Sequence, residues 1–216
     1  MALVARVVAS APSTTVTLVD LDAGALVREA TVTHDRHDPD SWWVGLQRAF
    51  AEVAEPEVDI ASISVAASPG VVVLDADRRP LWVAHPGDVD AGPDAGWLTK
   101  QLDGADAWTA AIGRAPTGDD AISALSWLHR SEPAVWERLA VVASPLAVLL
   151  ERLTGRLVTS ADDAASTGYW SPAGRTYRLD LLAIVDRERD WSGALPDVVA
   201  TGDEVGTWQG SPVVVG

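Results

Sequence analysis

Three short segments rich in β-branched residues open the chain, and they restrict the folds that it can adopt. Residues 2–8 and 14–21 lie on either side of a Pro-Ser pair, which predicts the two strands of a hairpin. A turn at residues 22–24 and alternating polarity at residues 25–33 predict a third strand. Strands with one apolar face need a second layer of structure to cover that face.

A helix and a further strand come next in the sequence. Asp40 or Ser41 is expected to cap a helix that runs to about Ala54. The predicted apolar stripe of this helix consists of Trp43, Leu46, Phe50 and Val53. The apolar run at residues 60–66 predicts a buried strand, and residues 71–84 predict a hairpin. This order of elements indicates a mixed α/β domain.

The rest of the chain alternates between helical patterns and short apolar runs. Helices are predicted at residues 94–102, 121–130, 133–139, 145–153 and 180–185. Short strands are predicted at residues 141–142 and 156–159. Residues 186–216 are expected to hold turns and short strands.

Composition excludes several classes of partner and site. The 216 residues carry 31 acidic and 16 basic side chains, a net charge of −15. Such a surface repels phosphate backbones and anionic lipid, so neither nucleic acid nor a membrane is an expected partner. Because the chain has no cysteine, disulfides and thiolate metal sites are excluded. The chain shows no apolar run of membrane-spanning length and no signal-peptide pattern, so we expect a soluble, cytoplasmic protein.

Tryptophan is unusually abundant, with ten residues against one phenylalanine. Each indole combines a large apolar area with one hydrogen-bond donor, which suits half-buried packing positions. Packing is the simpler interpretation for these side chains, and the lining of a sugar site is the alternative.

An acidic pair in the segment LTGRLVTSADDAASTGYW, residues 153–170, is the main candidate for chemistry. Asp162 and Asp163 are expected to lie in a small-residue loop directly after a strand. A carboxylate held there can take a proton from a substrate hydroxyl group. The alternative is a loop carboxylate that only caps the next turn.

Two further places carry candidate residues. The turn Ser68-Pro69-Gly70 could offer one hydroxyl contact to a ligand, or it could be a plain β-turn. His85 beside Asp88 and Asp90 could suggest a metal site, although a solvated loop is the simpler interpretation. The same holds for the cluster at residues 34–38.

Several segments of the chain together resemble the FGGY family of sugar kinases, and within it the first domain of the xylulokinase branch. They are DPDSWW at 38–43, ISVAASPGVVVLDADRRPL at 63–81, the block from 125 to 170, and shorter matches at 177–182, 195–196 and 202–206. The central block is the most specific of them. The resemblance covers nearly the whole chain.

The resemblance implies a single ribonuclease-H-like α/β domain over residues 1–216, with helical insertions, of the kind shared by actin, hexokinase and sugar kinases. In that family Asp163 would be the catalytic base toward a ketopentose such as D-xylulose, and Ser68, Pro69 and Asp88 would contact the sugar. ATP and Mg²⁺ serve the intact family enzyme, mostly through a second domain. Because the sequence ends where the strand toward that domain would begin, we expect the ATP-binding domain to be absent, in a cut piece, a naturally short protein or half of a split enzyme.

The resemblance also shows departures from the family pattern. Val8 stands where the family has an Asp that helps to place magnesium, and residues 9–11 followed by Pro12 replace its phosphate loop. Valine offers no oxygen ligand, and proline has no backbone N–H. The turn at residues 67–70 lacks the family's substrate-contacting histidine, and the stretch 85–92 lacks its arginine. We therefore expect no residue of this chain to bind ATP, Mg²⁺ or another metal.

Three functions remain open at this stage. The chain could be part of an ATP-dependent ketopentose kinase, although the substitutions predict no activity for the isolated chain. It could be a non-catalytic relative that binds a sugar or a protein partner. It could also be a remnant that only folds or forms a homodimer.

Overall fold

The computed structural model of the chain describes residues 2–10, 12–54 and 59–216. Residue 11 of the predicted phosphate turn lies outside the described residues. The chain divides into two compact units. We call the first the sheet unit, which comprises the segments that end at Ser68, Pro145–Ser160 and Asp197–Gly216. The second is the helical unit, which comprises Pro69–Ser144 and Ala161–Pro196.

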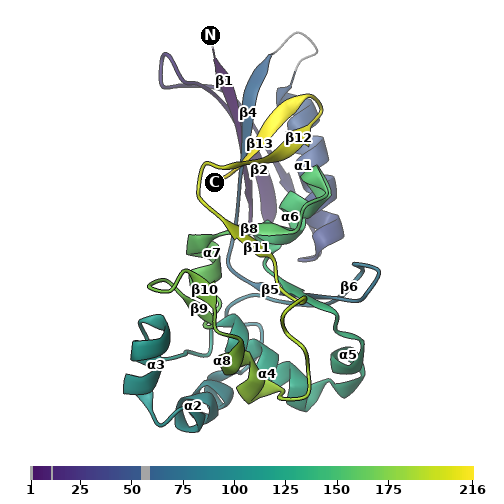
Figure 1. Cartoon of the computed structure of the whole chain (residues 1–216). Coiled ribbons are helices and arrows are strands. Elements are labelled where there is room, and N and C mark those ends of the chain that lie inside the picture. Colours follow the sequence, from purple (N-terminus) through teal and green to yellow (C-terminus); the bar gives the residue numbers. More distant parts are fainter. Residues whose placement is uncertain (1, 11, 55–58) are drawn as a thin grey trace. The chain divides into compact units, whose positions relative to one another are not determined.

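The sheet unit contains a six-stranded sheet in the order β12-β13-β4-β1-β2-β3. Its strands are β1 (Leu3–Ala9), β2 (Ser13–Asp20), β3 (Ala25–Thr33), β4 (Ile60–Ala67), β12 (Glu204–Trp208) and β13 (Ser211–Val215). Strands β1, β2 and β3 are antiparallel neighbours, whereas β4 pairs in parallel with β1, and β13 pairs in parallel with β4 (Figure 1). The predicted three-strand opening and the fourth strand are confirmed, but β4 is buried only at Ile60, Ile63 and Val65 and not along its whole length.

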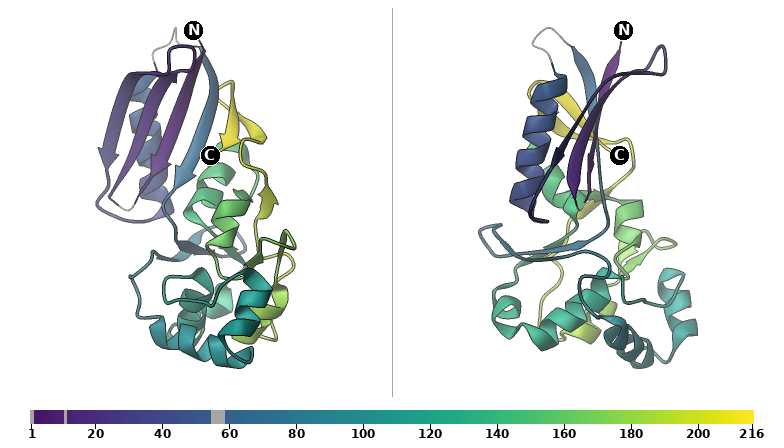
Figure 2. Two further views of the ribbon diagram at one scale, coloured as in Figure 1. Left: turned by 90° about the vertical axis from the view of Figure 1, so that its left-hand side faces the viewer. Right: turned by 180° about the vertical axis from the view of Figure 1, so that it is seen from behind.

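Alternation along the strands sets which side chains face the core. Val7 of β1 pairs with Val16 of β2, and both are buried. The next residue, Val8, points to the other side and is 48% exposed. Helix α1 (Pro39–Val53) packs against β2 and β3 and covers one face of the sheet (Figure 2).

Helix α1 begins earlier than its sequence predicts. Asp38, not Asp40 or Ser41, is the N-cap, and its carboxylate accepts a hydrogen bond from the Ser41 N–H at 2.8 Å. Pro39 then occupies the first helical turn, where no backbone N–H is needed. The predicted stripe is also wrong at one position, because Trp42 is buried and Trp43 is only half-buried.

Helix α6 (Pro145–Thr154) completes the sheet unit together with a short strand pair. It packs against β4, β12 and α1, and almost all of its apolar residues are buried. Gly155, at φ 74°, ends the helix as predicted. Strand β8 (Val158–Ser160) then pairs in parallel with β11 (Asp197–Val199).

The helical unit has a small antiparallel sheet, a hairpin and most of the helices. The sheet has the order β6-β5-β7, and β9 pairs with β10. These strands are β5 (Val71–Leu74), β6 (Pro80–Ala84), β7 (Val141–Ala143), β9 (Trp170–Ser171) and β10 (Thr176–Tyr177). The helices are α2 (Gly92–Gln101), α3 (Ala105–Ile112), α4 (Ala121–Ser131), α5 (Pro133–Arg138), α7 (Ala161–Ala165) and α8 (Leu179–Val185).

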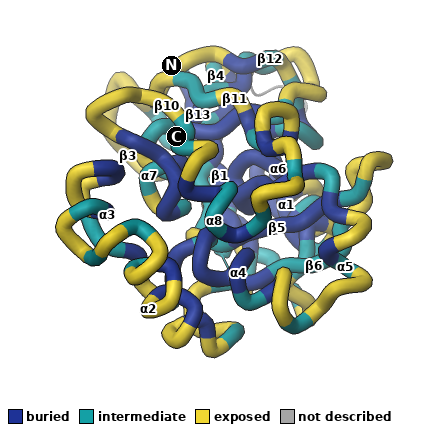
Figure 3. Tube along the Cα trace, turned by 60° about the horizontal axis from the view of Figure 1, so that its bottom comes forward, coloured by how far each residue is buried: buried dark blue, intermediate teal, exposed yellow. Residues whose placement is uncertain are grey.

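Tryptophan and leucine side chains form much of the core of the helical unit. Helix α4 contributes the fully buried Ile122, Leu125 and Leu128, and its trace is largely buried in Figure 3. Trp108 of α3 is fully buried, and its indole N–H donates to the Leu98 carbonyl at 3.1 Å. Within the described residues, no helix has the length and apolarity needed to cross a bilayer.

Candidate functional site

The predicted base, Asp163, lies on the short helix α7 and not in a loop as predicted. Its side chain is partly exposed, whereas Asp162 is fully exposed. The Asp163 carbonyl accepts hydrogen bonds from the Ser166 N–H at 3.1 Å and from the Ser166 hydroxyl at 2.7 Å. Ser166 is a small polar residue, and its hydrogen bonds back to Asp163 end helix α7.

The segment that follows α7 is fixed against the start of helix α4. The Ile122 N–H donates to the Thr167 carbonyl at 2.9 Å. Gly168 has φ +83°, and a Cβ atom at this position would lie 2.7 Å from Cγ2 of Ile122. Glycine is therefore required here both for its backbone conformation and for the close approach to α4. This contact positions α7 and Asp163.

A buried tyrosine lies next to the candidate base. Tyr169 is 3% exposed. Burial raises the pKa of its phenol well above the usual value of 10.0, and electrostatic interactions with Tyr177 and Asp163 raise this pKa further. The phenol therefore stays protonated at every physiological pH, while the Asp163 charge acts on it from nearby.

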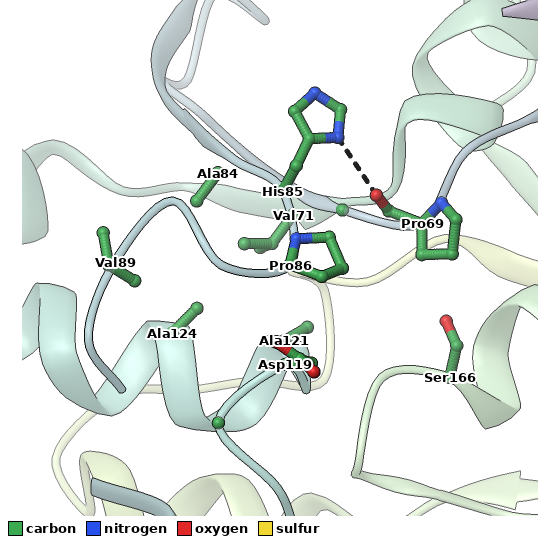
Figure 4. A pocket seen from close by; sticks show the side chains of 12 residues that line it. Pro69, Val71, Ala84, His85, Pro86, Val89, Asp119, Ala121, Ala124 and Ser166 are labelled. Carbon is green, nitrogen blue, oxygen red and sulfur yellow. Dashed lines mark hydrogen bonds between the residues drawn. The ribbon is translucent and has the colours of Figure 1, made fainter. Parts of the chain in front are cut away.

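A small cavity in the helical unit brings together residues from separate segments (Figure 4). Pro69 and His85 line it from the β5–β6 hairpin, Asp119 from the loop before α4, and Ser166 from the end of α7. Its volume of about 20 Å³ is enough for one water molecule and too small for a pentose. A bound sugar would therefore contact the rim of this cavity or require it to open.

His85 connects two of the predicted sugar contacts. Its Nδ1–H donates to the Pro69 carbonyl at 3.0 Å, because a carbonyl can only accept (Figure 4). The Asp88 carboxylate accepts from the His85 backbone N–H at 2.8 Å, and the Asp88 N–H donates to the His85 carbonyl at 3.0 Å. The Asp88 carboxylate therefore stabilises the turn that runs from His85 to Asp88, and the Asp88 side chain remains exposed.

Of the predicted site residues, Pro69 lines this cavity, and Ser68, Asp88 and Asp163 are not among its lining residues. Asp88 and Asp163 belong to the helical unit, and Ser68 is the last residue of its segment of the sheet unit, where its N–H donates to the Ala9 carbonyl at 2.8 Å. Sequence reasoning did not identify Ser166 or Asp119 as lining residues. No local motif marks them, because their places depend on how α7 and α4 meet.

The loop before α4 is held by an ion pair. Arg114 donates two hydrogen bonds to the Asp120 carboxylate, at 2.6 and 2.5 Å. Asp120 is 5% exposed and also accepts from the Thr117 N–H at 2.6 Å. These bonds fix residues 114–120, and with them the position of Asp119 on the cavity wall.

Ser10 and Pro12, the described residues of the β1–β2 turn, do not suit a phosphate or a magnesium ion. The Ser10 N–H already donates to the Ser13 carbonyl at 2.8 Å, and Pro12 has no N–H to offer. Val8 supplies no oxygen ligand at the end of β1. Among the described residues, no group of three or more His, Cys, Asp or Glu side chains could hold a metal ion.

Comparison with known proteins identifies what the whole chain is similar to. The sequence profile of the FGGY family of carbohydrate kinases, N-terminal domain, matches residues 23–213. The xylulose kinase of Streptomyces coelicolor is 32% identical over 218 residues, which cover 95% of this chain and 44% of that relative. The chain thus spans less than half of the length of this relative.

Solved structures agree with this family profile. The xylulose kinase of Rhodospirillum rubrum superimposes with a TM-score of 0.89 at 25% identity, over 99% of this chain and 48% of that one. The xylulose kinase of Bifidobacterium adolescentis gives a TM-score of 0.87 at 23% identity, over 99% of this chain and 52% of that one. The chain therefore has the fold of sugar kinases of the actin and hexokinase type.

Proposed function

Because the chain belongs to the FGGY family of carbohydrate kinases, as an N-terminal domain, we propose that it binds a ketopentose such as D-xylulose and does not phosphorylate it by itself. The observation that carries the proposal is that one cavity is lined both by Ser166, directly after the Asp163 helix, and by Pro69 of the predicted sugar turn. Two segments far apart in sequence meet there. The similar xylulose kinases support D-xylulose as the first sugar to test.

The proposed role of Asp163 follows from the chemistry of its carboxylate and from the contact that holds its helix in place. A partly exposed carboxylate can accept a hydrogen bond from a sugar hydroxyl, and in an intact kinase it can take the proton of that hydroxyl. The contact of Gly168 with Ile122 holds α7 in place. In the proposed site, Asp163 binds the reacting hydroxyl, while Pro69 on the cavity wall and the exposed Asp88 contact the rest of the sugar.

The proposed lack of phosphoryl transfer follows from the β1–β2 turn. Transfer from ATP needs a magnesium ion and donors for the phosphate oxygen atoms. In the described part of the turn, the Ser10 N–H is used internally and Pro12 offers none, and the side chain of Val8 in the preceding strand has no oxygen. An intact family enzyme draws most of its ATP site from a second domain, and we propose that residues 1–216 correspond to the first domain alone.

Calorimetric titration with D-xylulose tests this proposal. We expect measurable heat with the wild-type chain and binding at least about tenfold weaker in Asp163→Asn, because a hydrogen bond to a charged acceptor is lost. Asp162→Asn is the matched control, since it removes the same charge from the exposed neighbour and should leave binding unchanged. Equal weakening by both variants would show a general charge effect and contradict the role of Asp163.

A non-catalytic protein-binding domain is the second candidate function. The small volume of the cavity favours it, because about 20 Å³ does not admit a sugar without rearrangement. Absence of heat from D-xylulose, D-ribulose and related ketoses would support this candidate and overturn the first. The cytoplasmic location and the homodimer stay predictions from the sequence, and light scattering of the purified chain tests the dimer.

A further inference from the structure

A second and much larger cavity lies elsewhere in the helical unit. Its volume is about 610 Å³, within the usual range for small-molecule sites. Helices α2, α4 and α8 provide most of its lining, and it shares no lining residue with the cavity that Ser166 and Pro69 line. The side chains that matter for the argument are Asp94, Trp97, Trp127, His129 and Arg130.

Two tryptophans form the apolar walls of this cavity. Trp97 of α2 is 43% exposed, which leaves a large apolar surface open to a ligand. Trp127 of α4 is partly buried and stacks on Trp82, with ring centroids 6.2 Å apart and an interplanar angle of 18°. This stacking fixes the indole of Trp127, so little conformational entropy would be lost when a ligand packs on it.

The polar groups around these walls include both donors and acceptors. The Asp94 carboxylate is 6% exposed and accepts from the Ser126 hydroxyl and the Arg130 guanidinium, each at 3.0 Å. Arg130 keeps further N–H groups at the rim, where its side chain is 63% exposed. His129 donates from Nδ1 to the Val185 carbonyl at 2.9 Å, which leaves Nε2 of the neutral ring as an acceptor.

The charges at the cavity favour a neutral ligand. The ion pair with Asp94 already balances the Arg130 charge, and the exposed Asp90 on the rim would repel an anion. A cation would be attracted by Asp90 but would also approach the exposed part of the Arg130 guanidinium, so these mixed charges give it no clear advantage. Hydroxyl groups, in contrast, both donate and accept, and so they match the mixture of Arg130 donors with Asp90 and His129 acceptors.

We propose that this cavity binds a neutral polyhydroxylated ring, a closed-ring sugar whose apolar face packs on Trp97 and Trp127. The site is separate from the proposed ketose site and does not depend on it. It also gives a use to the exposed part of Trp97, which core packing does not explain. The closed ring matters, because an open-chain ketose has no flat apolar face to stack.

Indole signals in two-dimensional NMR spectra of the ¹⁵N-labelled chain test this site. The probes are methyl glycosides of glucose, galactose, mannose and xylose, whose blocked anomeric carbon keeps the ring closed and prevents them from acting as ketose substrates. Trp97→Phe and Trp127→Phe assign the two signals. We expect at least one glycoside to shift both signals, and to bind about tenfold more weakly to Trp97→Ala.

The control variants and ligands distinguish sugar binding in this cavity from misfolding and from binding of charged ligands. Leu26→Ala removes another exposed apolar side chain, in the sheet unit, and should keep full glycoside binding. Trp97→Phe retains a ring and should keep part of the affinity, which would exclude misfolding as the cause of the loss. Absence of a shift from all four glycosides would overturn the proposal, as would stronger shifts of the same signals with choline or benzoate. Neither result would bear on the calorimetry with D-xylulose.

Discussion

Gly168 is the residue on which the position of the candidate base most depends. Its backbone lies in the left-handed region at φ +83°, and Cγ2 of Ile122 would lie 2.7 Å from an added Cβ atom. The sequence indicates a small residue in this segment but not the reason for it, because Ile122 lies far away along the chain. Val8 and Pro12 are the opposite case, since the lack of a side-chain oxygen at Val8 and of a backbone N–H at Pro12 can be read from the sequence alone.

Gly168→Ala is expected to destabilise the chain by about 2–4 kcal/mol, because it combines backbone strain with a clash against α4. Urea denaturation measures the change in the free energy of unfolding. Gly113→Ala is the matched control, since Gly113 has φ +89° with no atom within 4 Å of the added Cβ, and should cost only about 1 kcal/mol. Equal costs at both positions would show that the close approach to Ile122 does not matter.

Helices and strands with a clear periodic pattern of apolar residues can be predicted from the sequence, whereas those set by tertiary contacts cannot. Strands β1 to β3 alternate in polarity between turn residues, and helix α4 has an apolar stripe, so both were found from the sequence. Helix α3 was missed because it lies between glycines in a segment rich in Gly, Pro and Asp. The sequence predicts a loop where α7 lies, because five residues are too few to show a helical pattern.

The cap of α1 provides a prediction with a defined dependence on pH. Burial alone would raise the pKa of the Asp38 carboxyl, but hydrogen bonds from Ser41 and the charge and hydrogen bond of Arg36 outweigh it and hold this pKa below the usual 3.8. A group whose pKa is lowered on folding stabilises the fold above its unfolded pKa. This contribution is lost as the pH falls through the lower pKa of the folded state.

Asp38→Ala should therefore lower the free energy of unfolding by about 1 kcal/mol at neutral pH. The difference from the wild type should shrink as the pH falls below 3.8. Asp38→Asn keeps a capping oxygen without the charge, and so it should retain most of the stability and lose the pH-dependent part. Urea denaturation at a series of pH values measures both effects. A wild-type advantage over Asp38→Asn that stays constant down to the lowest pH would contradict this account.

For the molecule as a whole, the family and the fold can be recognised from the block at residues 125–170. The division into units and the size of the cavities cannot be recognised from the sequence. The two compact units, the volume of about 20 Å³ behind Ser166 and the larger cavity at Trp97 all depend on how side chains from distant segments pack. A single sequence carries no direct signal of such packing. The substitutions at Val8 and Pro12, in contrast, can be read residue by residue.

We propose that this domain retains a sugar site and does not transfer phosphate by itself. Phosphorus NMR of the purified chain with D-xylulose, ATP and Mg²⁺ is the decisive experiment, because it follows the transferred group. We expect no sugar phosphate to form, even at sugar concentrations that saturate the calorimetric signal. Sugar-dependent formation of a phosphate ester by the wild-type chain would contradict this proposal and would require phosphate ligands other than the β1–β2 turn.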